Sequence, residues 1–179
     1  MNPTVETDID FSNHFISEIK SIIVQSRLID EILVVAPPYE DMKHNTDLIV
    51  LEANQLRFVC RVRRPEMLEK YGKEFTIRYA RSNEAKTEFQ KIIEGWGSYI
   101  FYGFSGYDYK LKKWFIGDLT VFRSWYFDQL RLNNGKEPSS PIPNKDNSST
   151  FLPFKINDLP KEFIIAQSKD LSDWMSGNQ

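Results

Sequence analysis

Cysteine is nearly absent from this 179-residue sequence, which contains Cys60 alone. A single cysteine excludes an internal disulfide and any zinc site that is built from several cysteines. Cys60 lies within an apolar strand pattern, so we interpret it as a small buried hydrophobic residue. The only two histidines, His14 and His44, are isolated and show no metal-ligand spacing.

Long hydrophobic runs are also missing. No apolar stretch approaches the roughly 20 residues that span a bilayer. The first residues, MNPTVETDIDFSN, are acidic and lack the basic and apolar regions of a signal peptide. We therefore expect a cytoplasmic protein with no membrane partner. The sequence also has no glycine-rich phosphate loop, no G-x-S-x-G and no H-E-x-x-H motif.

Positive charge is concentrated in one segment, although the chain as a whole has a net charge of -2. That net charge provides no global attraction to nucleic acid. Residues 57–81, however, contain eight basic and three acidic side chains, and six of the eight are arginines. The segment is either a solvated surface or an anion-binding region. The planar guanidinium group, which suits bidentate contacts with oxyanions, favours the second interpretation.

The hydrophobic periodicity predicts an α/β (α+β) fold, in a single domain with a mixed central β-sheet flanked by helices. The first expected elements are a helix within 11–31, a short strand at 32–36, and two hairpin strands within 44–64 that turn near 53–55. A strand at 75–80 and a helix within 83–97 follow. The last expected elements are a hairpin and the short helix into which it leads, within 98–127.

The chain divides into three parts by composition. Residues 1–132 carry the periodic patterns and should form the α/β core. Residues 133–150 are rich in proline, serine and asparagine and have few apolar side chains, so we expect a flexible linker. Residues 151–179 regain apolar clusters and are expected to dock on the core as a C-terminal tail.

The hairpin within 44–64 places two arginines together. Alternation along its second strand puts Arg61 and Arg63 on one face, and Thr76 and Arg78 share a face of the next strand. We therefore expect Asp47, Arg61, Arg63 and Arg78 to line one polar face at the end of the central strands. Two guanidinium groups on one side of a strand repel each other unless a carboxylate or a phosphate lies between them.

An aspartate that opens one central strand, followed by a charged pair with x-spacing at the end of the next, resembles the core of the restriction-endonuclease-like, PD-(D/E)XK, nuclease superfamily. The wider set of motifs is similar to a family of uncharacterised phage and prophage proteins. The resemblance covers roughly residues 11–127, and its motifs are DMKHNTDLIVL, RVRRPE, FTIR, AKTEFQKIIEGWGSYIFYG and WFIGDL.

The resemblance implies a catalytic site at Asp47, Arg61 and Arg63, with Asp47 as a Mg²⁺ ligand. Arg61 and Arg63 occupy the positions of the superfamily's acidic-x-Lys pair. Arg63 can supply the positive charge of the lysine, but a guanidinium group is a poor proton acceptor. Arg61 cannot replace a carboxylate that binds metal. A second carboxylate would therefore have to come from Glu40, Asp41 or Glu88.

Each acidic candidate also has a structural interpretation. Asp47 can cap a turn before the strand. Glu88 can form an exposed i,i+3 helix pair with Lys91. Asp118 interrupts an apolar strand pattern, and a buried carboxylate there would need a partner such as Arg61, Arg63 or Arg123.

Two functional hypotheses follow from the sequence. In the first, the protein is nuclease-like and binds DNA or another phosphate-bearing ligand through Arg61, Arg63, Arg64 and Arg78, with Mg²⁺-dependent endonuclease activity left open. In the second, it is a protein-binding module, such as a phage factor that engages or inhibits a host protein. The aromatic residues within 99–127 motivate the second hypothesis if they are exposed. They have no such role if they fill the core.

Overall fold

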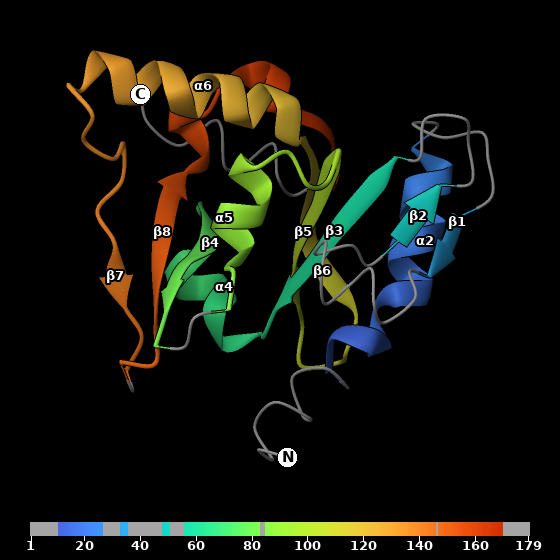
Figure 1. The fold of residues 1–179 in the computed structure, drawn as a ribbon. Helices are drawn as coiled ribbons and strands as arrows, with labels where there is room; N and C mark the ends of the chain where they lie inside the picture. The colour runs from blue at the N-terminus through green and yellow to red at the C-terminus, as the bar shows by residue number, and fades with distance from the viewer. Residues whose placement is uncertain are drawn as a thin grey trace.

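The computed structural model describes residues 11–26, 33–35, 48–50, 56–82, 85–145 and 147–169, and of 33–35 and 48–50 it describes the backbone alone. These residues form two β-sheets that share a core, with helices packed around them (Figure 1). The mixed α+β class predicted from the sequence is confirmed.

The larger sheet contains the hairpin that the sequence predicts. Its strands, in spatial order, are β1 (Leu33–Val35), β2 (Leu48–Val50), β3 (Arg57–Arg63), β5 (Tyr99–Ser105), β6 (Leu111–Asp118) and β9 (Ile164–Gln167). β3 and β5 are parallel and all other neighbours are antiparallel, so the sheet is mixed as expected. β2 pairs with β3, with Leu48 opposite Phe58. The turn predicted at 53–55 lies outside the described residues.

The smaller sheet corrects the expectation of one central sheet. It has the order β4-β8-β7, formed by β4 (Glu74–Arg81), β8 (Ser149–Lys155) and β7 (Ile142–Pro143). β4, which we expected beside the hairpin, instead pairs antiparallel with β8. Alternation identifies a strand but not its partner, and here the partner lies about seventy residues further along the chain.

One face of the larger sheet is covered by α2 (Ile16–Gln25). Ile19 and Ile23 of this helix are almost fully buried and pack in one cluster with Phe58 and Phe101. These helix residues belong to the apolar stripe that predicted the helix.

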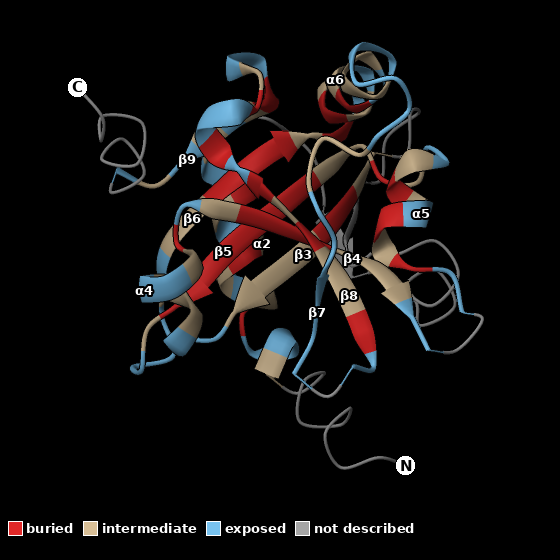
Figure 2. Cartoon of the chain, turned by 90° about the vertical axis from the view of Figure 1, so that its left-hand side faces the viewer, coloured by how far each residue is buried: buried red, intermediate tan, exposed pale blue. Residues whose placement is uncertain are grey.

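The opposite face packs against the smaller sheet and the remaining helices. These are α4 (Glu66–Tyr71), α5 (Glu88–Ile93) and α6 (Leu119–Leu132), followed late in the chain by the 3-10 turns η1 (Ile156–Asp158) and η2 (Lys161–Phe163). α6 lies across one end of both sheets (Figure 1). The buried aromatic rings between these elements are Phe75, Phe89, Tyr102, Phe104, Phe115, Phe122, Tyr126, Phe154 and Phe163. Figure 2 shows the buried residues concentrated on the central strands.

Most of the aromatic residues within 99–127 therefore belong to the core. Tyr102 and Phe115 are almost fully buried. Three rings remain exposed, namely Tyr107 (77%), Tyr109 (59%) and Phe127 (46%). Among the described residues, no helix combines the length and the apolar character needed to cross a membrane.

The C-terminal part of the chain contributes one strand to each sheet through β8 and β9. β8 pairs with β4 in the smaller sheet, and β9 pairs with β6 in the larger sheet. Before them, the segment 133–150 contains the short β7 and is anchored by Glu137, whose carboxylate accepts hydrogen bonds from the hydroxyls of Tyr79 and Tyr126. The flexibility expected of this segment stays a prediction.

Limited proteolysis can measure that flexibility. We expect the first cleavages by trypsin within the described ranges to fall at Lys136 or Lys145, because both are exposed and lie between α6 and β8 on a segment with little apolar surface. Mass spectrometry of the early fragments identifies the sites. Early cleavage elsewhere, with this segment intact, would contradict the prediction.

Gly117 allows a buried ring to lie directly on β6. A Cβ atom at this position would be 2.5 Å from Cζ and 2.6 Å from Cε2 of Phe163. The Phe163 ring is fully buried among Phe75, Phe115 and Phe122, so it has no space into which to move. The absence of a side chain at Gly117 is therefore a packing requirement.

We expect Gly117→Ala to lower the free energy of unfolding by about 1–3 kcal/mol, because the added methyl group overpacks the core. Urea denaturation measures the change. Gly106→Ala is the matched control, since its Cβ would meet Cε and Cγ of Lys112 and Oδ1 of Asp108, and these two exposed side chains can turn aside. An unchanged midpoint for Gly117→Ala would show that the Phe163 ring can shift.

Candidate functional site

A polar cleft of about 440 Å³ lies between the C-terminal end of β3 and the smaller sheet. We call it the arginine cleft, because five arginines line it and Glu88 is the one acidic residue among the lining residues that the structure describes. These residues are Phe11, Ser12, Val59, Cys60, Arg61, Val62, Arg63, Arg64, Met67, Arg78, Arg81, Glu88, Asn144 and Phe151.

The geometry of β3 and β4 places three of the arginines around one aromatic ring, that of Phe151. Arg61 and Arg63 lie on the face of β3 that is turned toward the smaller sheet, where Arg78 is directly opposite Phe151 in the β4-β8 register. The guanidinium carbons of Arg61, Arg63 and Arg78 lie 5.6, 6.0 and 5.6 Å from the centroid of the Phe151 ring. All three distances are within the range of cation–π attraction, so Phe151 stabilises the cluster.

Glu88 supplies the negative charge of the cleft. It forms an ion pair with Arg61 and accepts a hydrogen bond from the backbone N–H of Arg78 at 3.3 Å. Thr87 fixes the helix that carries it, since Thr87 is the N-cap of α5, forms a capping box with Gln90 and donates a hydrogen bond to the carbonyl of Tyr79. Glu88 is therefore held in place by both β4 and β3.

Arg63 lies deeper in the cleft and forms no ion pair with a carboxylate in the described part of the chain. Burial lowers the pKa of its guanidinium, and the neighbouring charge of Arg61 lowers it further, although Tyr102 and Glu88 act in the opposite direction. An arginine nevertheless stays protonated at neutral pH. The result is a partly desolvated cation that an additional anion would stabilise.

The remaining arginines form the rim. Arg64 is exposed, and its guanidinium carbon lies 4.5 Å from the centroid of the Phe11 ring. Arg81 is also exposed, and Asn144 from the segment before β8 lies along the same cleft. Arginine side chains therefore line the cleft both at its partly buried base, where Arg63 lies, and at its exposed rim.

The structure brings together four of the residues singled out in the sequence, namely Arg61, Arg63, Arg64 and Arg78. The expected shared face of Arg61 and Arg63 is confirmed, although the facing strand belongs to a second sheet. Asp47, expected beside them, lies outside the described residues, as do Glu40 and Asp41.

Two acidic candidates have roles that differ from those expected. Glu88 is turned into the cleft with its side chain only 10% exposed, so the exposed helix pair with Lys91 was the wrong interpretation. Asp118 is not buried among apolar side chains: it ends β6, and its carboxylate caps α6 by accepting hydrogen bonds from the N–H groups of Thr120 and Val121. A capping position explains why a charged residue follows an apolar strand.

The described lining of the cleft does not fit a magnesium ion. Magnesium requires several oxygen ligands, whereas Glu88 is the only carboxylate here and is already bound by Arg61 and Arg78. Four further guanidinium groups would repel the ion. Within the described ranges, no three His, Cys, Asp or Glu side chains gather at one place.

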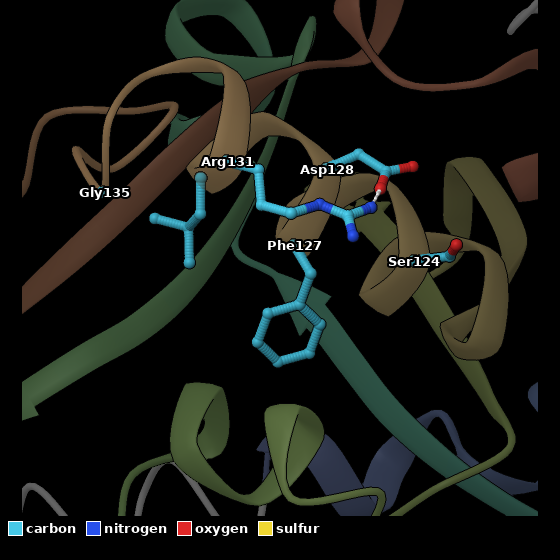
Figure 3. Close-up of a pocket in the computed structure, with 6 residues that line it drawn as sticks. Ser124, Phe127, Asp128, Arg131 and Gly135 are labelled. Carbon is cyan, nitrogen blue, oxygen red and sulfur yellow. Dashed lines mark hydrogen bonds and ion pairs between the residues drawn. The ribbon is translucent and has the colours of Figure 1, made fainter.

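A more open hollow lies on the outer surface of α6 (Figure 3). It has a volume of about 690 Å³, and its lining includes Phe127, Leu130 and Gly135. Arg131 is paired with Asp128 one helical turn away, so the charges in this hollow are balanced. It therefore lacks the excess of one charge that distinguishes the arginine cleft.

The ion pair of Arg61 and Glu88 can be tested by comparison with a second pair at the same helix. We expect Arg61→Ala to lower the free energy of unfolding by about 1.5–3 kcal/mol, because it leaves the largely buried carboxylate of Glu88 without its strongest partner. Lys86→Ala, which breaks the exposed pair with Glu94, should leave the melting temperature unchanged.

A double-mutant cycle with Glu88→Ala separates the pair from other effects. We expect the double variant to lose less free energy of unfolding than the two single variants lose together. The reason is that the double variant leaves neither the Arg61 nor the Glu88 charge without its partner. Strict additivity in urea denaturation would show that the two side chains do not stabilise each other.

No protein-family model and no curated protein matches this chain. The chemistry of the site is therefore derived from its own residues. On that basis, the arginine cleft is the strongest candidate site within the described part of the chain.

Proposed function

We propose that the protein binds nucleic acid, and that the arginine cleft contacts the phosphate groups. The observation that carries the proposal is that the described lining of one concave site contains five arginines and one carboxylate. Guanidinium groups bind phosphate oxygens through charge-assisted hydrogen bonds, often in pairs.

The state of Arg63 supports an anionic ligand. Placing a cation in a partly desolvated site without a carboxylate partner is unfavourable for the folded protein alone. A phosphate group in the cleft would compensate that cost and would also reduce the repulsion between Arg63 and Arg61. The ligand would therefore stabilise the folded protein by an amount that grows with the logarithm of its concentration relative to Kd.

The resemblance to the PD-(D/E)XK nucleases agrees with nucleic acid as the ligand, and nucleic acid would be accessible to a cytoplasmic protein. Our proposal is limited to binding. Metal-dependent cleavage would need carboxylates beyond Glu88, and the candidates for them are Asp47, Glu40 and Asp41.

A second function is favoured by a different part of the surface. Phe127 and Leu132 of α6 are exposed, and the hollow beside them could receive a protein side chain. Such a site would fit a protein-binding module, including one that engages a host protein. Its binding should be insensitive to substitutions in the arginine cleft, which separates it from the first proposal.

Arg63→Ala provides the sharpest test of phosphate binding. We expect it to weaken binding of a fluorescent single-stranded DNA and to reduce the slope of log K against log salt concentration by about one. The melting temperature of the free protein should change little, because no carboxylate is left unpaired. Fluorescence anisotropy at several salt concentrations and a thermal scan measure the two effects.

Arg131→Ala is the matched control, since it removes an exposed arginine of α6 that is not among the residues lining the arginine cleft. It should bind DNA as the unmodified protein does. If Arg61→Ala and Arg63→Ala both bind DNA with unchanged affinity, the phosphate proposal is wrong.

A further inference from the structure

We infer that the ligand of the arginine cleft is a terminal phosphate, the phosphomonoester at the end of a nucleic-acid strand or on a free nucleotide. This inference rests on the proposed function and specifies its ligand class. A strand interior, with its phosphodiesters, is the alternative that the inference excludes as the preferred ligand.

The first argument is depth. The side chain of Arg61 is only 17% exposed, and Arg63 is desolvated enough for burial to lower its pKa. Both are reached between the end of β3 and Phe151 of the facing sheet. The phosphates of a duplex lie on a convex surface, so they can approach the rim arginines Arg64 and Arg81 but not the base of the cleft. A strand end is slim enough to enter.

The second argument is size. The cleft has a volume of about 440 Å³, which lies within the roughly 300–1,000 Å³ of small-molecule sites. One terminal nucleotide matches this space better than a run of several nucleotides does. Longer strands would leave the cleft past the exposed rim.

The third argument is charge. Among the described residues of the cleft, Glu88 is paired with Arg61, and Arg63 forms no ion pair with a carboxylate. A phosphomonoester carries about -1.5 to -2 charges at pH 7 and offers three terminal oxygens. A phosphodiester carries one charge and has two free oxygens. The monoester therefore offsets more of the positive charge at a single position.

The fourth argument is direction. Arg61 and Arg63 approach Phe151 from the larger sheet, whereas Arg78 approaches it from the smaller sheet. Donors from two sides suit a phosphate whose three oxygens are all accessible. A phosphodiester needs two open paths for its two ester links, and Glu88 with the start of α5 occupies one side of the cluster.

The experiment compares two single-stranded oligonucleotides of the same sequence, one with a 5′-phosphate and one with a 5′-hydroxyl. We expect the phosphorylated strand to bind the full-length protein at least tenfold more tightly. A third strand, with a 3′-phosphate, shows whether the site distinguishes the two ends. A tenfold preference at either end supports the inference.

Two variants assign the preference to the cleft. Arg63→Gln should bring the ratio of the two affinities close to one, because it removes the deep cation. Arg81→Gln should weaken both strands by a similar factor and keep the ratio, because Arg81 lies at the exposed rim. An unchanged ratio in Arg63→Gln would overturn the inference.

The outcomes also separate the inference from the proposed function. Equal affinities for all three strands, with binding still weakened by Arg63→Gln, would refute the terminal phosphate and leave nucleic-acid binding intact. Absence of binding by any strand would refute the proposed function, and absence of binding by a nucleoside 5′-monophosphate as well would refute the inference. Competition by a nucleoside 5′-monophosphate, compared with inorganic phosphate, then identifies the source: strong competition by the nucleotide indicates a free nucleotide, and weak competition indicates a strand end.

Discussion

The mutual repulsion of Arg61, Arg63 and Arg78 is the constraint around which this part of the structure is arranged. Three guanidinium groups share one aromatic ring, and like charges at such separations are unfavourable in a partly desolvated site. The carboxylate of Glu88 pairs with Arg61 and contacts the backbone at Arg78, and the centroid of the Phe151 ring lies within 6.0 Å of all three guanidinium carbons. These contacts stabilise the cluster.

The two-sheet architecture is what allows the cluster to form. β3 belongs to the larger sheet and β4 to the smaller one, and the aromatic core between them holds the two sheets together. Toward the end of β3 that core gives way to arginines, so the space between the sheets changes from apolar to polar along a single strand. The cleft therefore continues the interface between the two sheets beyond the aromatic core, and the packing of that core holds its two walls in place.

The capping contacts at the two helices beside the sheets show how local signals serve the site. Thr87 starts α5 and also binds the backbone of β4, which leaves the next residue, Glu88, directed at β3. Asp118 is both the last residue of β6 and the N-cap of α6. The chain therefore passes directly from the strand into the helix, and α6 packs over the aromatic core. The Thr87 cap thus positions the side chain of Glu88, and the Asp118 cap positions α6 against the core.

The sequence by itself determined the strand at 57–63 and which of its side chains share a face, because alternation along a strand is a local property. It also determined most of the other elements, through the apolar stripe of α2 and the β5-β6 hairpin. It did not reveal that β4 belongs to a separate sheet, that Glu88 pairs with Arg61, or that three arginines gather at the ring of Phe151. Only the tertiary structure decided these, because they depend on strand partners far apart along the chain and on the packing of one sheet against another. Periodicity assigns a residue to a face, but the pairing of distant strands decides what that face meets.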